Sequence, residues 1–155
     1  MRALTTIRDA QEADLPALAR LYAAAFGDPA DHDGPSSIEA AWQRLRAEAP
    51  TARVLVAELS GEVVGTLTLF ELPLLTHRGA PAALVESVAV DPHLQGRGIG
   101  RALMNEAMAR ARAAGCYKLA LSSNTKRNEA RAFYERLGFQ RHGVSFVAHL
   151  RSDVT

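Results

Sequence analysis

Residues 91–104, DPHLQGRGIGRALM, decide how the rest of this 155-residue chain is interpreted. They join a β-branched, apolar run to a segment with helical spacing, and the helix opens on three glycines and two arginines within residues 96–101. Helices usually begin with Ser, Thr, Asp or Asn and carry carboxylates in the first turn, which satisfy the free N–H groups and the positive end of the dipole. Because this helix start supplies no negative charge, we expect its backbone N–H groups to bind an external anion.

Three kinds of glycine loop could account for this segment. A P-loop ends in Gly-Lys-Ser/Thr, whereas Gly100 is followed by Arg101. A dinucleotide fingerprint needs glycine at its sixth position, which counted from Gly96 is again Arg101. The pattern that fits is Gln-x-x-Gly-x-Gly, formed by Gln95, Gly98 and Gly100. Its glycines would let backbone N–H groups approach a pyrophosphate without hindrance from a Cβ; the alternative is a flexible turn with a poor cap.

The composition excludes several classes of protein. With 18 basic and 17 acidic residues the net charge is +1, which argues against nucleic-acid binding driven by overall charge. Cys116 is the only cysteine, so an intrachain disulfide and a multi-cysteine zinc site are excluded, and the histidines have no metal-ligand spacing. No apolar run is long enough for a signal peptide or a membrane span. We therefore expect a cytoplasmic protein without a metal and without membrane attachment.

Hydrophobic periodicity predicts the secondary structure on both sides of the glycine loop. Strands are expected at residues 4–9, 52–59, 63–72, 82–90, 116–123 and 144–150, and helices at 12–26, 37–47, 98–113 and 127–138. Asp14 and Ser37 (or Ser36) are the expected helix caps, Gly61 the hairpin turn, and Gly115 the left-handed end of the third helix. The nearly continuous apolar run at 116–123 is typical of a buried central strand. The order of the expected strands and helices along the chain predicts one mixed α+β domain.

Two motifs together resemble a known family. The segment LVESVAVDPHLQGRGIGRALM (84–104) is followed about two dozen residues later by NEARAFYERLGF (128–139). The combination resembles the GNAT superfamily of acetyl-CoA-dependent N-acetyltransferases over roughly residues 54–150, while the helical N-terminal third fits the family order more loosely. The resemblance implies one GNAT-like α+β domain over residues 1–155. It would hold a mixed, mostly antiparallel sheet of about six to seven strands flanked by about four helices.

The resemblance also implies acetyl-CoA as cosubstrate and assigns residues to it. The loop amides of residues 95–101 would hold the pyrophosphate, and the pantetheine arm would pair with the backbone of residues 88–90 like an added strand. Asn124 and Asn128 match a polar contact to coenzyme A, although Asn128 could equally be a helix cap. The implied cofactor-binding residues are Val88, Ala89, Val90, Gln95, Gly96, Arg97, Gly98, Ile99, Gly100, Arg101, Asn124, Asn128, Phe133 and Tyr134.

Acetyl transfer to an amine requires a base for the amine and an acid for the departing thiolate. Tyr134 matches the family's tyrosine near the cofactor sulfur, and a phenol with a pKa near about 10 is protonated at neutral pH; alternatively it completes an apolar helix face with Phe133 and Leu137. Glu86 interrupts an apolar strand, where charges are rare unless functional or paired. It is either the base that deprotonates the amine or a carboxylate bound to an arginine; Ser87 is a weaker candidate.

The predicted protein is thus an acyltransferase that acetylates a primary amine directly in a ternary complex, with no acetyl-cysteine intermediate on Cys116. Its partners would be acetyl-CoA and an amine-bearing acceptor, with small-molecule amines, amino sugars included, favoured over protein N-termini or lysines. A non-catalytic coenzyme A-binding sensor or partner module is the alternative from another class. The sequence leaves the acceptor's identity and a homodimer open.

Overall fold

The structure, a computed structural model, describes residues 4–28, 34–123 and 128–151. The chain divides into two compact units, Met1–Leu121 and Ser122–Thr155, and each is described here by itself. The first unit contains a five-stranded sheet with the helices α1 (Leu15–Phe26), α2 (Ile38–Glu48) and α3 (Ile99–Ala113). The second contains α4 (Asn128–Arg136). The α+β class and the four helices were predicted, whereas the described residues hold five strands where six to seven were expected.

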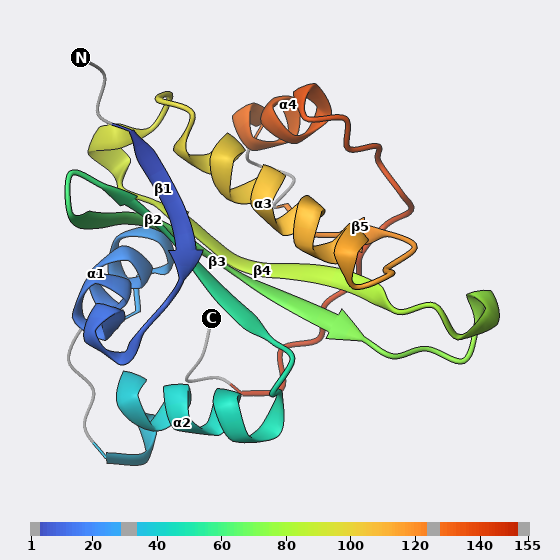
Figure 1. The fold of residues 1–155 in the computed structure, drawn as a ribbon, viewed down its shortest axis with the longest axis horizontal. Helices are drawn as coiled ribbons and strands as arrows, with labels where there is room; N and C mark the ends of the chain where they lie inside the picture. Colours follow the sequence, from blue (N-terminus) through green and yellow to red (C-terminus); the bar gives the residue numbers. More distant parts are fainter. Residues whose placement is uncertain (1–3, 29–33, 124–127, 152–155) are drawn as a thin grey trace. The chain divides into compact units, whose positions relative to one another are not determined.

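The sheet has its strands in chain order, β1-β2-β3-β4-β5 (Figure 1). The strands are β1 (Thr5–Asp9), β2 (Arg53–Leu59), β3 (Glu62–Leu72), β4 (Ala82–Val90) and β5 (Leu119–Ala120). The first four are antiparallel to their neighbours, and β5 is parallel to β4. Gly61, at φ +84°, forms the predicted turn between β2 and β3. The prediction of a mixed, mostly antiparallel sheet is confirmed.

Two predicted strands differ from the structure. The run 116–123 forms only the two residues of β5, which pair with Ala83 and Leu84 at the outer edge of the sheet rather than at a buried central position. β4 carries a bulge shortly beyond this pairing, and a bulged strand bends away from the straight course that a parallel neighbour needs. The run 144–150 has strand-like composition but no strand structure, because a strand forms only where its backbone groups find a ladder partner.

The helix ends follow the sequence with one exception. Ser37 caps α2 by accepting a hydrogen bond from the backbone N–H of Ala40 at 3.1 Å. After α3, Gly115 takes φ +78° and donates to Arg112, while Cys116 donates to Ala111, both at 3.0 Å. This is the Schellman arrangement, and it confirms Gly115 as the predicted left-handed end. The expected cap Asp14 precedes α1, but its side chain does not cap that helix.

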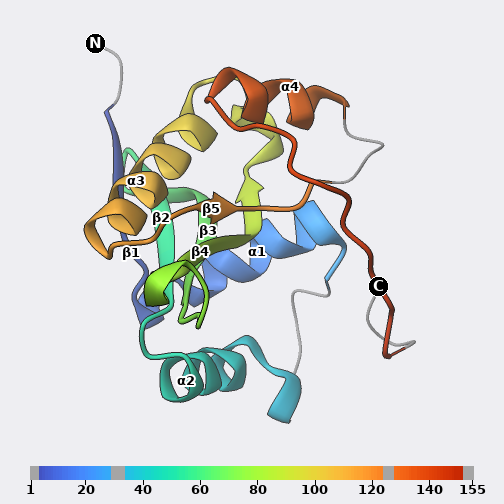
Figure 2. The ribbon, with the colours of Figure 1, turned by 90° about the vertical axis from the view of Figure 1, so that its right-hand side faces the viewer.

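Opposite faces of the sheet are covered by α1 and α3 (Figure 2). A Cβ on Gly65 of β3 would lie 2.9 Å from Ile99 Cγ2 and 3.2 Å from Leu103 Cδ1, so glycine is what allows α3 to approach this closely. The neighbouring Thr66 points to the other face, because side chains alternate along a strand. On that face an apolar cluster joins α1 and α2 to β2; its members are Ala10, Leu15, Leu18, Trp42, Val54 and Val56. The contact of Ile99 with Gly65 places the start of α3 over β3, the middle strand of the sheet.

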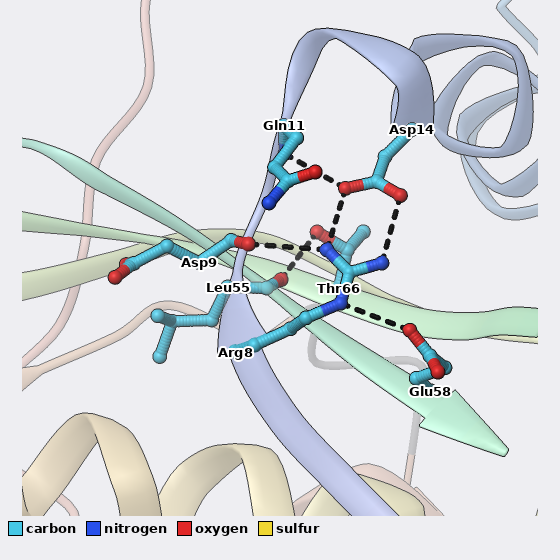
Figure 3. Close-up of polar contacts among 7 residues, drawn as sticks. All are labelled: Arg8, Asp9, Gln11, Asp14, Leu55, Glu58 and Thr66. Carbon is cyan, nitrogen blue, oxygen red and sulfur yellow. Dashed lines mark hydrogen bonds and ion pairs between the residues drawn. The ribbon is translucent and has the colours of Figure 1, made fainter. Parts of the chain in front are cut away.

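An ion-pair network fixes the connection between β1 and α1 (Figure 3). Arg8 contacts both carboxylate oxygens of Asp14, at 2.7 and 2.9 Å, and donates through Nε to Glu58 at 2.9 Å. The backbone N–H of Gln11 donates to Asp14 at 2.7 Å. The hydrogen bond from Arg8, followed by that from Gln11, holds the pKa of the Asp14 carboxyl below its ordinary value against the opposing effect of burial. This pairing with Arg8 replaces the capping role expected for Asp14.

We expect Asp14→Asn to lower the free energy of unfolding by about 2–4 kcal/mol at neutral pH, because the charged partner of Arg8 is lost. A depressed carboxyl pKa contributes stability above the unfolded-state value of about 3.9, and this contribution disappears as the pH falls through the folded-state pKa. The difference between wild type and variant should therefore shrink in acid. Urea unfolding at several pH values measures it, with the exposed Glu12→Gln as control. A difference that stays constant down to the acid range would contradict this electrostatic origin.

Candidate functional site

The glycine loop leads from β4 into α3 through two left-handed residues. Asp91 closes a short turn by accepting from the N–H of His93 at 2.9 Å. Gly96 then has φ +79° and Gly98 φ +84°, a region that residues with a Cβ rarely adopt. Gly98 is the N-cap residue of α3, and no side chain caps the helix or places an acid in its first turn. The free N–H groups of the first turn are thus open to an anion, as the sequence suggested.

The loop side chains divide into exposed cations and one buried anchor. Arg97 and Arg101 are exposed and have no ion-pair partner among the residues that the structure describes. Ile99 is 2% exposed and packs against Gly65, so its side chain belongs to the core and only its N–H can serve a ligand. Gln95 is exposed at the start of the loop. This combination of free amides, a helix dipole and two unpaired guanidinium groups is suited to a phosphate or pyrophosphate.

β4 presents an open edge beside this loop. Its pairing with β5 is limited to Ala83 and Leu84, so over residues 85–90 the edge opposite β3 has no strand partner in the described part of the chain. Val88 and Val90 are half-buried there, and Ala89 is buried and pairs with Thr66 of β3. Unpaired backbone groups on such an edge can bind an extended, amide-containing ligand.

A bulge interrupts β4 at Ser87. Thr66 pairs with Ala89 but Thr68 pairs with Glu86, so β4 contains one residue more than β3 in this interval. Ser87 takes φ +55°, a conformation that costs a non-glycine residue about 1–3 kcal/mol. Bulges redirect side chains and often lie next to active sites. Both Glu86 and Ser87 are exposed at this position.

Glu86 faces solvent without a cationic partner. It forms no ion pair among the described residues, so the arginine-bound alternative is not seen. Directly across the ladder lies Thr68 of β3, whose side chain is on the same face of the sheet. The sequence did not identify Thr68, Thr66 or Tyr22 of α1 as candidate site residues. The available signal was two hydroxyl residues inside the apolar strand VVGTLTLFEL.

In the second unit, α4 holds the predicted tyrosine among aromatic rings. The Tyr134 ring lies 5.1 Å from that of Phe133 and 5.8 Å from that of Phe139, both edge-on. Gly138, at φ +93°, ends the helical turn as predicted. Asn128 is the first residue of α4, and Asn124 lies outside the described residues. Tyr134 is half-buried, so packing accounts for its ring while its hydroxyl remains a candidate for chemistry.

Cys116 is poorly suited to be a nucleophile. It is half-buried at the end of α3, a helix of 15 residues and therefore about 20 Å from the glycine loop. Burial, together with the negative charge of Glu71, raises the pKa of its thiol. A raised pKa lowers the fraction of reactive thiolate at neutral pH.

Two further features concern the described residues alone. None of their helices has the length and apolar character required to cross a membrane. Groups of three or more His, Cys, Asp or Glu side chains in metal-binding proximity are also not found in this part of the chain.

Comparison with known proteins identifies the family of this site. Residues 15–139 match the family described as "Acetyltransferase (GNAT) family". An aminoglycoside N(6')-acetyltransferase type 1 of Stenotrophomonas maltophilia is 34% identical over 141 residues, which cover 87% of this chain and 86% of that protein. A glucosamine 6-phosphate N-acetyltransferase of Trypanosoma brucei brucei is 37% identical over 90 residues, which cover 58% of this chain and only 59% of that protein.

A solved structure agrees with these sequence matches. An acetyltransferase of Trypanosoma brucei superposes with a TM-score of 0.79 at 29% sequence identity. The superposition covers 95% of this chain and all of the other. The fold and the order of elements are therefore shared over nearly the whole length.

Proposed function

This chain belongs to the GNAT family of acetyltransferases, and from that membership we propose that it transfers the acetyl group of acetyl-CoA to the primary amine of an amino sugar. GNAT acetyltransferases use acetyl-CoA. The observation that carries the proposal is the uncapped, glycine-rich start of α3 beside the open edge of β4. These two features are what a ligand with a pyrophosphate and an amide-containing arm requires.

The residues of the loop and of β4 fit this cosubstrate. The N–H groups of residues 95–101 would bind the pyrophosphate, with Arg97 and Arg101 adding positive charge. The backbone of Val88 and Val90, on the unpaired edge of β4, would bind the amides of the pantetheine arm. Acetyl-CoA supplies the activated acetyl group, and every other task in the reaction falls to the protein.

Two residues are proposed to move protons. Glu86, exposed and free of ion pairs among the described residues, would accept a proton from the acceptor's ammonium group and so leave a neutral nucleophile. Tyr134 would donate the proton of its phenol to the departing sulfur. Transfer is direct, with both substrates bound at once, because Cys116 lacks the properties of an acyl carrier.

The names of the relatives support an amino-sugar acceptor. One relative is named for glucosamine 6-phosphate and the other for aminoglycosides, and both acceptors carry primary amines on a sugar ring. Protein N-termini, lysine side chains and a purely coenzyme A-binding role are the alternatives. The exposed position of Glu86 beside the bulge favours a catalytic role over binding alone.

An acceptor screen tests the proposal. Release of free thiol from acetyl-CoA is followed with glucosamine 6-phosphate, an aminoglycoside, a peptide with a free N-terminus and a lysine peptide. We expect the highest kcat/KM with one of the two sugars. Preference for a peptide would show that the acceptor is a protein amine and not an amino sugar. Tight acetyl-CoA binding without thiol release for any amine would show that the protein is a coenzyme A-binding sensor and not an enzyme.

Cys116→Ser should leave kcat and both KM values within about twofold of wild type, because no covalent intermediate forms on the thiol. Initial-velocity lines should intersect when both substrates are varied, as expected for a ternary complex. Parallel lines, together with an acetylated protein detected by mass spectrometry and lost in the serine variant, would establish a double-displacement route instead.

A further inference from the structure

Thr66 and Thr68 place two hydroxyl groups inside β3, on the face of the sheet that α1 covers. Thr66 is fully buried and Thr68 is 7% exposed. Valine would fill a similar volume without the cost of burying a hydroxyl, and the surrounding side chains of this face are apolar. Buried hydroxyl groups of this kind require hydrogen-bond partners.

The two threonines find different partners. Thr66 donates to the backbone oxygen of Leu55 at 2.8 Å, whereas Thr68 makes no such backbone bond among the described residues. Tyr22 of α1 packs against the apolar cluster near both threonines; burial raises the pKa of its phenol, and the two threonine hydroxyls oppose that rise. Because the one proton of Thr66 is given to Leu55, Thr68 carries the hydroxyl of the two that is not committed to the backbone. The lone pairs of the Thr68 oxygen can therefore accept a hydrogen bond from a further donor.

Thr68 and Glu86 are direct partners across the β3–β4 ladder. Such partners have Cβ atoms about 4.5–5.5 Å apart and side chains on the same face. Glu86 and Thr68 are thus neighbours on one face of the sheet, next to the bulge at Ser87. A group that donates several hydrogen bonds would be satisfied by both.

We propose that Thr68 and Glu86 together bind the amino group of the acceptor, with Tyr22 as the positioning residue that orients the Thr68 hydroxyl. This inference rests on the proposed function. A primary ammonium group carries three N–H donors, of which Glu86 takes one and Thr68 another. A hydroxyl group at the same position of a sugar has a single proton and satisfies only one of them. The pair therefore selects amines over alcohols.

Steady-state kinetics with the best amine of the acceptor screen test this role. Thr68→Val should raise the KM for the amine about tenfold or more while the KM for acetyl-CoA stays unchanged, because a hydrogen bond to a charged group is lost. Thr68→Ser, which keeps the hydroxyl, should stay within about threefold of wild type. Tyr22→Phe should raise the amine KM about three- to tenfold, since the Thr68 hydroxyl loses its fixed orientation.

A matched control and a non-kinetic readout separate binding from packing. Thr66→Val removes the equivalent hydroxyl two residues earlier in β3, where it already donates to the backbone of Leu55. This variant should be less stable but should show no selective change in the KM for the amine. Calorimetry measures the binding of the amine and of its hydroxyl analogue. Thr68→Val should weaken binding of the amine far more than binding of the analogue.

Equal weakening of both ligands, or a wild-type amine KM in folded Thr68→Val, would overturn the assignment. If Thr68→Val does not fold, Tyr22→Phe carries the same test, and wild-type amine KM in that variant would refute the orienting role. A wild-type protein that acetylates no amine would instead refute the proposed function, and this inference with it.

Discussion

Replacing Tyr134 with phenylalanine should lower kcat about 10²–10⁴-fold, the range typical of a lost general acid. The change removes only the hydroxyl, so the edge-on contacts of the ring with Phe133 and Phe139 persist. The KM for acetyl-CoA should stay within about threefold, because the role proposed for the phenol is to protonate the departing sulfur and not to bind the ground state. Steady-state kinetics and calorimetry with acetyl-CoA measure the two effects separately.

Tyr117→Phe provides a control for this variant. Tyr117 is another tyrosine in an aromatic contact, stacked on His77 with ring centroids 3.9 Å apart, and it has no proposed part in the reaction. Its phenylalanine variant should keep wild-type kcat. Wild-type turnover in Tyr134→Phe would show that Tyr134 serves packing alone, which is the reading that helical spacing by itself supports.

Valine at Gly98 and Gly100 should weaken acetyl-CoA binding roughly 10- to 100-fold, because branched side chains would block the approach of a phosphate to the N–H groups of α3. A Cβ at Gly98 would meet no protein atom within 4 Å, so it would project into the space left for the ligand. Gly100 lies within α3, and its variant carries no left-handed strain. Isothermal titration calorimetry with acetyl-CoA and with coenzyme A measures the loss.

Backbone strain is the competing cause, since valine is unfavourable at φ +84°. Gly115→Val is a close match, because Gly115 has φ +78°, lies at the opposite end of the same helix and also has open space around a Cβ. It should lower stability like Gly98→Val yet leave acetyl-CoA affinity intact. Equal affinity losses in both variants would mean that strain, rather than the anion site, is responsible. An unchanged affinity in folded Gly100→Val would argue against the loop as the pyrophosphate site.

The local features of this fold could be read from the residues alone. The uncapped start of α3, its end at Gly115, the cap at Ser37 and the turn at Gly61 depend on contacts within a few residues. Backbone conformation at such positions is set by the presence or absence of a Cβ and by short side-chain hydrogen bonds. The same reasoning placed Glu86 within β4 and the glycine loop between the end of that strand and the start of α3.

Predictions from the local sequence pattern were wrong where a residue distant in the chain determines which structure forms. Residues 116–123 and 144–150 have strand composition, yet only Leu119 and Ala120 form a ladder. Asp14 had the position of a cap but pairs with Arg8, because a guanidinium group is a stronger partner than a backbone N–H. Neither the availability of a neighbouring strand nor a competing ion pair is visible in a local pattern.

Only the tertiary structure brings together the residues of the proposed acceptor site. Thr68 and Glu86 are 18 residues apart in sequence and become neighbours only through the register of β3 with β4, which a single bulged residue at Ser87 shifts by one. Tyr22 lies near Thr68 because α1 packs on the same face. In a pleated sheet a shift of one residue moves a side chain to the opposite face. Which groups meet there is therefore decided by long-range pairing and not by the local order of residues.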